Sequence, residues 1–141
     1  MEHTDCIFCK IIAGEIPSSK VYEDDVVYAF LDLGQVTKGH TLVIPKTHTK
    51  DIYETSDEIA GDLFARVPKI AKAIKETFHP LGINMLSNTG EAAGQSVFHL
   101  HMHLIPRYGK DDGFNPVWKT NGDAYSQDDL IAISQDINSN I

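Results

Sequence analysis

The feature that most constrains this chain is an alternating stretch that runs from Gln95 to Pro106. Read as a β-strand, it places every second residue on the same face. The apolar face holds Phe98, Leu100, Met102 and Leu104, and the opposite face holds His99, His101 and His103. The apolar side chains can enter a core while the other face carries three imidazoles in a row. Because proline cannot donate a ladder hydrogen bond, we expect strand pairing to weaken or end at Pro106.

The spacing of the three imidazoles limits what they can do together. Same-face neighbours on a strand begin about 6.6 Å apart, and the outer pair begins about 13 Å apart. Two adjacent histidines can converge on one zinc ion at about 2 Å from each nitrogen, whereas the outer pair can hardly share a metal. We therefore expect the three to have different roles. The alternative is an ordinary exposed strand face, which strict alternation on an otherwise apolar strand disfavours.

The stretch matches the motif of the histidine-triad (HIT) family at every position, with three histidines alternating with apolar residues. The resemblance runs from about Cys6 to Arg107. It is greatest to the small nucleoside phosphoramidases, whose triad strand is also led by Gly-Gln-Ser-Val, here residues 94–97. It implies an α+β fold, with an antiparallel sheet of about five strands, one long and one or two short helices, and a homodimer whose sheet continues across the subunits. Residues 1–107 would form the HIT domain, and residues 108–141 a tail and helix that complete it.

Length, charge and hydropathy narrow the class of protein. A chain of 141 residues suffices for one domain with a real core. Its net charge of −8 argues against a nucleic-acid partner, since such proteins normally present a basic face. No apolar run approaches the length of a membrane span, and no signal peptide precedes Cys6. We therefore expect a soluble cytoplasmic protein without a membrane partner.

The pair Cys6 and Cys9 is the first candidate metal site. It has three interpretations: a zinc half-site, a redox disulfide or two buried small residues. A thioredoxin-like motif would follow a strand, and none is predicted before Cys6. Zinc needs two more ligands, and the chain offers His48 and His99. The resemblance implies this set, because many HIT proteins hold zinc with the residues at these positions. Four protein ligands would make the zinc structural, so the chemistry would require no cofactor.

Apolar residues near the N-terminus and in the predicted hairpin of residues 20–31 have two interpretations. Core packing is the simpler one. The resemblance makes them the walls of a pocket for a purine nucleotide similar to AMP. The set consists of Ile7, Phe8, Ile11, Ile16, Phe30 and Leu33. Asp32 follows the second strand of the hairpin, where it can start a turn or, as the resemblance implies, accept hydrogen bonds from ribose hydroxyls.

Further elements follow from periodicity and capping signals. Short apolar runs predict strands at residues 41–45 and 83–87. A long amphipathic helix begins after Thr55, which we expect to cap it, with Glu58 completing a capping box. A short helix is predicted over residues 7–13 and a closing helix over residues 126–137.

A loop of small residues, 88–96, precedes the triad strand. Such loops are common turns, but exposed amides beside histidines also suit phosphate oxygens. The resemblance assigns Asn88, Gly94, Gln95 and Ser96 to the phosphate or the leaving group. It gives His40 a supporting role beside the triad.

These assignments predict a nucleotide hydrolase. Neutral His101 would attack the α-phosphorus, and water would release the monophosphate from a covalent nucleotidyl-histidine. His103 would protonate or position the leaving group, and Ser96 would hand over the proton. Transferase relatives carry Gln in place of His103, so the third histidine favours hydrolysis.

Three alternatives to a nucleoside phosphoramidase are a nucleotide-binding or scaffolding module with little turnover, a dinucleoside polyphosphate hydrolase, and a zinc hydrolase that uses a metal-bound water. The sequence leaves the leaving group and the role of Trp118 open.

Overall fold

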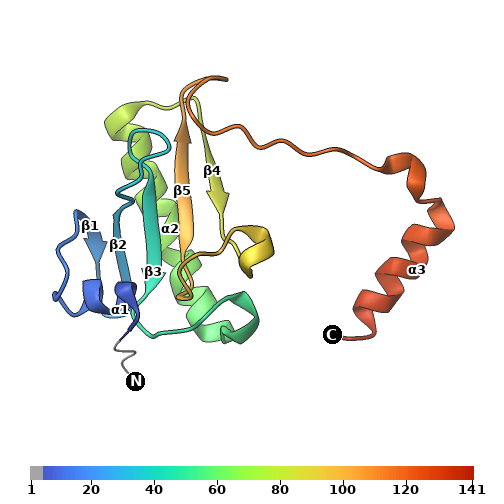
Figure 1. The fold of residues 1–141 in the computed structure, drawn as a ribbon, viewed down its shortest axis with the longest axis horizontal. Coiled ribbons are helices and arrows are strands. Elements are labelled where there is room, and N and C mark those ends of the chain that lie inside the picture. The colour runs from blue at the N-terminus through green and yellow to red at the C-terminus, as the bar shows by residue number, and fades with distance from the viewer. Residues whose placement is uncertain (1–4) are drawn as a thin grey trace.

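The computed structural model describes residues 5–141, and in this part of the chain five strands form one antiparallel sheet (Figure 1). The strands are β1 (Lys20–Glu23), β2 (Val27–Leu31), β3 (Thr41–Pro45), β4 (Gly82–Leu86) and β5 (Met102–Arg107). Their order is β1-β2-β3-β5-β4, so β1 and β4 are the two edges. The α+β fold and the five-stranded sheet are confirmed. The expected strand at 83–87 is shifted by one residue.

Helices cover the sheet on both faces, because the strands alternate apolar side chains between them. Helix α2 (Asp57–Phe78) lies on one face and buries Leu63, Val67, Ile70 and Ile74 against the sheet. On the other face, the short helix α1 (Ile7–Ile12) packs Phe8 and Ile11 against side chains of β2 and β3. The third helix, α3 (Gln127–Asn138), begins after the expected cap, Ser126. Three short 3₁₀ helices are η1 (Ile52–Glu54), η2 (Glu91–Ala93) and η3 (Gly122–Ala124).

The cap of α2 differs from the expected one. Ser56, not Thr55, is the N-cap, and its hydroxyl accepts a hydrogen bond from the amide of Ile59. The Thr55 hydroxyl instead donates to the carbonyl of Asp51 at 2.6 Å. With Ser56 as the cap, the third helical residue is Ile59, so the predicted capping box with Glu58 does not form. Serine and threonine are both preferred N-cap residues, and the turn before α2 engages Thr55 instead.

The triad strand is shorter than predicted. Strand β5 begins only at Met102, so Gln95 to His101 is irregular backbone. Burial is also reversed at its start: Phe98 is 38% exposed, whereas His99 is fully buried. The physical reason is that His99 has polar partners inside the protein, including the carbonyl of Pro45 at 2.8 Å.

Pro106 ends strand pairing with β3 but not with β4. Pairing with β3 stops at Leu104, opposite Thr41, but pairing with β4 continues to Arg107, opposite Gly82. Proline lacks a donor but keeps its carbonyl, and the carbonyl of Pro106 accepts a hydrogen bond from the Thr37 hydroxyl at 2.6 Å. A missing donor therefore weakens the ladder on one side only.

The C-terminal segment stands away from the sheet (Figure 1). Arg107 pairs with Asp112 at 2.8 Å and holds the turn from which the segment departs. Every residue from 115 to 141 is exposed, including Trp118 at 82%. None of these side chains is therefore buried in the core of its own chain, and the completion of the domain by residues 108–141 stays a prediction.

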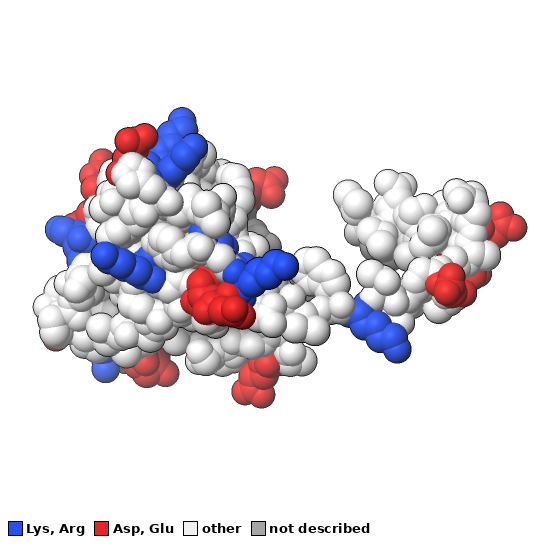
Figure 2. Space-filling view, turned by 90° about the horizontal axis from the view of Figure 1, so that it is seen from above, with Lys and Arg blue, Asp and Glu red and all other residues white. Residues whose placement is uncertain are grey.

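The surface charges and the apolar character of the helices can be compared directly with the sequence. On the face in Figure 2, acidic and basic side chains are interspersed over the sheet domain and form no continuous basic area. Within residues 5–141, no helix combines the length and the apolar character that crossing a membrane requires.

Candidate active site

The three histidines of the triad lie in a row on the face of the sheet that α1 covers. The ring of Phe8 in α1 meets the rings of His99 and His101 edge to face, with centroids 5.9 and 5.1 Å away. The rings of His101 and His103 follow at 5.0 Å. His103 pairs across the sheet with Leu42, whose side chain belongs to the same apolar cluster as Phe8. The predicted row of imidazoles is therefore present, although only His103 belongs to a strand.

His101 is held in one tautomer by its own backbone neighbour. Its Nδ1 lies 2.7 Å from the carbonyl oxygen of His99. Because a carbonyl can only accept, Nδ1 carries the proton, and in the neutral ring Nε2 is left with a lone pair. The ring is 7% exposed, and this burial lowers the pKa of His101, an effect that the His99 carbonyl partly opposes. Neutral His101 thus has a lone pair on Nε2, which a nucleophile requires.

His40 fixes the tautomer of His103 in a similar way. The amide of Val36 donates to Nδ1 of His40 at 3.3 Å, so neutral His40 carries its proton on Nε2. That nitrogen lies 2.9 Å from Nδ1 of His103, which must accept. Neutral His103 therefore keeps its own proton on Nε2 and can donate it to a ligand.

Burial keeps both rings of this pair neutral. It lowers the pKa of His40, and the nearby carboxylate of Asp32 only partly offsets the effect. The pKa of His103 falls to about 4, first because the ring is buried and then because His101 and His40 lie close by. At neutral pH, His103 is therefore a hydrogen-bond donor rather than a cation.

Asp32 stands beside this pair at the end of β2. Its Oδ1 accepts from the amide of Gly34 at 2.8 Å, and its Oδ2 lies 3.6 Å from Nε2 of His40. The carboxylate of Asp32 starts a turn, as the simpler interpretation held. It is also partly exposed, so its hydrogen bonds to ribose hydroxyls remain a prediction. Gln35 braces the turn through the backbone of Asp32, His40 and Gly39. Gln35 and Val36 escaped the sequence analysis, because a contact with backbone atoms leaves no residue pattern.

The loop before the triad is more self-contained than expected. The amides of Ala93, Gly94 and Gln95 donate to carbonyls within the loop, which forms η2, so these three are not offered to a phosphate. The side chain of Gln95 is 4% exposed. It bonds the amide of Gly90 and the carbonyls of Lys50 and Val97. We therefore assign Gln95 to bracing the loop rather than to direct contact with substrate.

The remaining loop positions stay available for a ligand. Asn88 is partly exposed and Ser96 is exposed. Gly94 has φ of +99°, and a Cβ there would lie 3.4 Å from the Asn88 amide. Gly94 therefore shapes the backbone beside Asn88. The contacts of Asn88, Gly94 and Ser96 with substrate remain predictions.

The predicted walls of the nucleotide pocket divide into two groups. Phe8, Ile11 and Phe30 are buried in the cluster under α1, with Ile16 packed at its border. Leu33 is 96% exposed and Ile7 is 46% exposed. The first group thus serves as core, as the simpler interpretation held, while its border and the exposed residues remain candidates for contact with a base.

Four side chains gather beside the N-terminal part of α1, in a cluster that we call the Cys–His cluster: Cys6, Cys9, His48 and His99. Nδ1 of His99 lies 3.5 Å from Sγ of Cys6 and 3.6 Å from Sγ of Cys9, and Nδ1 of His48 lies 3.3 Å from Sγ of Cys9. Around tetrahedral zinc, a sulfur and a nitrogen ligand are about 3.6 Å apart, from bond lengths of about 2.3 and 2.1 Å. The donor set and its spacing therefore fit zinc.

The second nitrogen of His99 completes the fit. Its Nε2 lies 2.8 Å from the carbonyl of Pro45, which can only accept. Neutral His99 therefore has its proton on Nε2 and a lone pair on Nδ1, the atom that faces both sulfurs. A carbonyl behind a histidine ligand is a common arrangement in metal sites.

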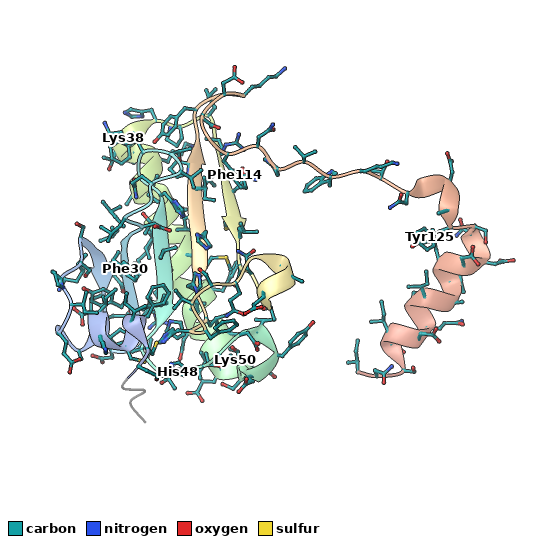
Figure 3. The ribbon with its side chains drawn as sticks, viewed as in Figure 1. Phe30, Lys38, His48, Lys50, Phe114 and Tyr125 are labelled. Atoms are coloured by element: carbon teal, nitrogen blue, oxygen red, sulfur yellow. The ribbon has the colours of Figure 1, made fainter. Side chains whose placement is uncertain are left out.

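A cavity of about 650 Å³ lies on the outer side of the loop, next to Ser96, Lys50 and Phe98. Figure 3 shows His48 and Lys50 at this end of the sheet, remote from Lys38 and Phe114. None of the triad histidines lines this cavity. The candidate active site is therefore the histidine row and not this cavity.

Comparison with known proteins decides the family. The model of the HIT domain matches residues 13–110. The chain belongs to the HIT family. It is 65% identical over 133 residues to "Protein hit" of Bacillus subtilis, covering 94% of this chain and 92% of that protein. It is 40% identical over 136 residues to adenosine 5′-monophosphoramidase hnt1 of Schizosaccharomyces pombe, covering 96% and 98%.

A solved structure of the HIT family matches this chain over almost its whole length. A crystal structure of a HIT family protein from Bacillus anthracis matches with a TM-score of 0.96 and 57% sequence identity, and the match covers 98% of each chain. The matched part of this HIT protein includes the C-terminal segment, since no more than 2% of the chain lies outside it. The B. anthracis protein therefore has a corresponding C-terminal segment.

Proposed function

We propose that this HIT protein hydrolyses nucleoside 5′-phosphoramidates or related nucleotidyl conjugates through a covalent intermediate on His101. The observation that carries the proposal is the hydrogen bond from Nδ1 of His101 to the carbonyl of His99. It leaves Nε2 as the nucleophilic atom in a buried, neutral ring. A ring tied through both nitrogens could serve as a metal ligand or as packing, but not as a nucleophile.

The first step forms a bond between Nε2 of His101 and the α-phosphorus while the bond from phosphorus to the leaving nitrogen breaks. The electron pair of that bond goes to the leaving nitrogen, which takes a proton from the Ser96 hydroxyl. Nε2–H of His103 donates a hydrogen bond to a phosphoryl oxygen, where negative charge develops. His103 remains neutral here because its pKa is lowered to about 4.

The second step returns the enzyme to its starting state. Water attacks the phosphorus, the bond to Nε2 breaks, and the proton of the water restores the Ser96 hydroxyl. Between the two steps the ring of His101 carries phosphorus on one nitrogen and a proton on the other, so it is cationic. The carbonyl of His99 stabilises that charge at 2.7 Å.

A purine nucleotide is the substrate class that the site suits best. Asp32 presents a partly exposed carboxylate beside His40, which suits ribose hydroxyls. The border of the apolar cluster at Ile16 and the exposed Leu33 offer surface to a base. A relative with 40% identity is named as an adenosine 5′-monophosphoramidase, which supports adenine as the first base to test.

Rapid quenching tests the proposal. The protein is mixed with an adenosine 5′-phosphoramidate, quenched within milliseconds and examined by intact mass and peptide mapping. We expect adenylylation of His101, with loss of both the adduct and turnover in His101→Asn. Full turnover by that variant would eliminate the nucleophile. Tight nucleotide binding without an adduct would support the scaffolding alternative.

We also propose that zinc occupies the Cys–His cluster as a structural ion. The fit of two sulfurs and two nitrogens to a tetrahedral ion supports this. Zinc would join α1 to the segment before β5, so its removal should lower the melting temperature. A zinc hydrolase would form no adenylyl-histidine, which distinguishes that alternative in the same quench experiment.

Homodimerisation is proposed from the two sheet edges. Edge β1 carries Lys20 and Glu23, paired at 3.0 Å, and charge on an edge strand discourages pairing. Edge β4, of sequence Gly-Ile-Asn-Met-Leu, has no charged residue, and Met85 is 50% exposed. We therefore propose that β4 pairs with β4 of a second copy, which would make the sheet continuous. The exposed apolar residues of the C-terminal segment would also find partners on that copy.

A further inference from the structure

His99 belongs to two structures at once. Its ring is part of the Cys–His cluster, with Nδ1 within 3.6 Å of both sulfurs. Its backbone carbonyl accepts the hydrogen bond from Nδ1 of His101 at 2.7 Å. A single residue thus connects the candidate metal site to the candidate nucleophile, and only two side-chain torsions separate its ring from its backbone.

The sheet does not hold this carbonyl. Strand β5 begins at Met102, so His99 and Leu100 lack the ladder hydrogen bonds that fix a strand. Other contacts replace them: the amide of Leu100 donates to the carbonyl of Thr49 at 2.7 Å, and Nε2 of His99 meets the carbonyl of Pro45 at 2.8 Å. The Cys–His cluster supplies the contact on the other side of the His99 ring.

We infer that His99 is a positioning residue through which the intact Cys–His cluster sets the orientation of His101. The inference rests on the proposed nucleotidyl transfer. Loss of the cluster would leave the His99 ring with one hydrogen-bonded nitrogen, at the carbonyl of Pro45, and would remove a restraint on the irregular backbone that carries its carbonyl. The bond to His101 would then lengthen or lose alignment, which frees the other tautomer and weakens stabilisation of the cationic intermediate.

The Cys–His cluster can also influence His101 through helix α1, and the experiment must distinguish this route from the one through His99. Cys6 caps α1 through its sulfur, which accepts from the amide of Cys9, and Phe8 of α1 contacts the ring of His101. A change at Cys6 could therefore act by moving Phe8. His48 distinguishes the routes, because it belongs to the connection after β3 and its ring meets that of His99 at 4.9 Å.

The test compares Cys6→Ser and His48→Asn with the wild-type protein loaded with zinc. One readout is the rate of His101 adenylylation per folded molecule in the millisecond quench. The other, which needs no turnover, is the downfield proton resonance of Nδ1–H of His101, assigned by its loss in His101→Asn. Ile70→Val is the matched control, because it loosens the core under α2, on the opposite face of the sheet.

We expect both cluster variants to adenylylate about 10- to 100-fold more slowly, as is typical when support behind a reacting group is lost. Their Nδ1–H resonance should broaden or vanish, whereas Ile70→Val keeps both readouts. His48→Cys preserves four zinc ligands and should restore both. Rates within twofold of wild type and an unchanged resonance in both variants would overturn the inference, as would an effect confined to Cys6→Ser. If wild-type protein forms no adduct, the proposed function fails while the resonance still decides the coupling.

Discussion

Gln95→Met is the most direct test of how the loop before the triad is held. Gln95 is 4% exposed, and its amide makes hydrogen bonds of 2.8 Å to the amide of Gly90, 2.8 Å to the carbonyl of Lys50 and 3.2 Å to the carbonyl of Val97. Methionine has nearly the same length and volume, so the substitution removes the three bonds without opening a cavity. Each bond contributes about 1 kcal/mol net.

The expected loss in free energy of unfolding is about 2–3 kcal/mol, because water can reach the exposed Lys50 and replace part of what is lost. For a chain of 141 residues this corresponds to a fall in melting temperature of about 6–12 °C. Urea unfolding at fixed protein and zinc concentration measures the free energy, and its m-value should not change. Glu91→Gln, at an exposed position of the same loop, is the control.

Gln95→Glu separates hydrogen bonding from side-chain size. A carboxylate keeps the acceptor for Gly90 but faces the carbonyls of Lys50 and Val97, which also only accept. Its pKa in the folded protein should therefore lie above the unfolded value, so the stability of the variant relative to wild type rises as the pH falls through that raised pKa. A loss below about 0.5 kcal/mol in Gln95→Met, or a stability difference between Gln95→Glu and wild type that does not shrink in acid, would refute the reasoning.

Five further outcomes are expected. Because the pKa values of His101 and His103 are lowered, that of His103 to about 4, kcat/KM should stay on its plateau below pH 6.5 and fall only in more acidic buffer. The same shifts make the folded state bind fewer protons than the unfolded chain, so urea titrations should show stability complete above about pH 6.5 and lost as the pH falls towards 4. Met85→Lys should convert a dimer to monomers by light scattering, whereas a dimer that persists would place the interface elsewhere. Asp32→Asn should raise KM about tenfold to a hundredfold for a ribonucleotide, but hardly at all for an analogue without ribose hydroxyls. Gly113→Ala should cost about 1–3 kcal/mol in urea unfolding, because φ is +97° and a Cβ would lie 2.6 Å from the carbonyl of Val36.

The sequence was most informative where a pattern is repeated or spaced. Alternation located the row of histidines, helical spacing located α2, and the Cys-x-x-Cys pair, read with the family resemblance, indicated the four residues that the structure brings together. Each of these follows from the periodicity of local structure or from the few ligand types that a metal accepts. The family and the five-stranded sheet were predicted on that basis and are confirmed.

Only the tertiary structure decided how the site is held. Nothing in the sequence indicates that the strand begins at Met102, that the carbonyl of His99 sets the tautomer of His101, or that Val36 sets that of His103 through His40. These contacts use backbone atoms, which every residue carries, so the sequence cannot mark them. The sequence by itself determined which chemical groups this HIT protein carries. The packing of the chain determined which ring nitrogens of His101 and His103 are held by hydrogen bonds within the protein.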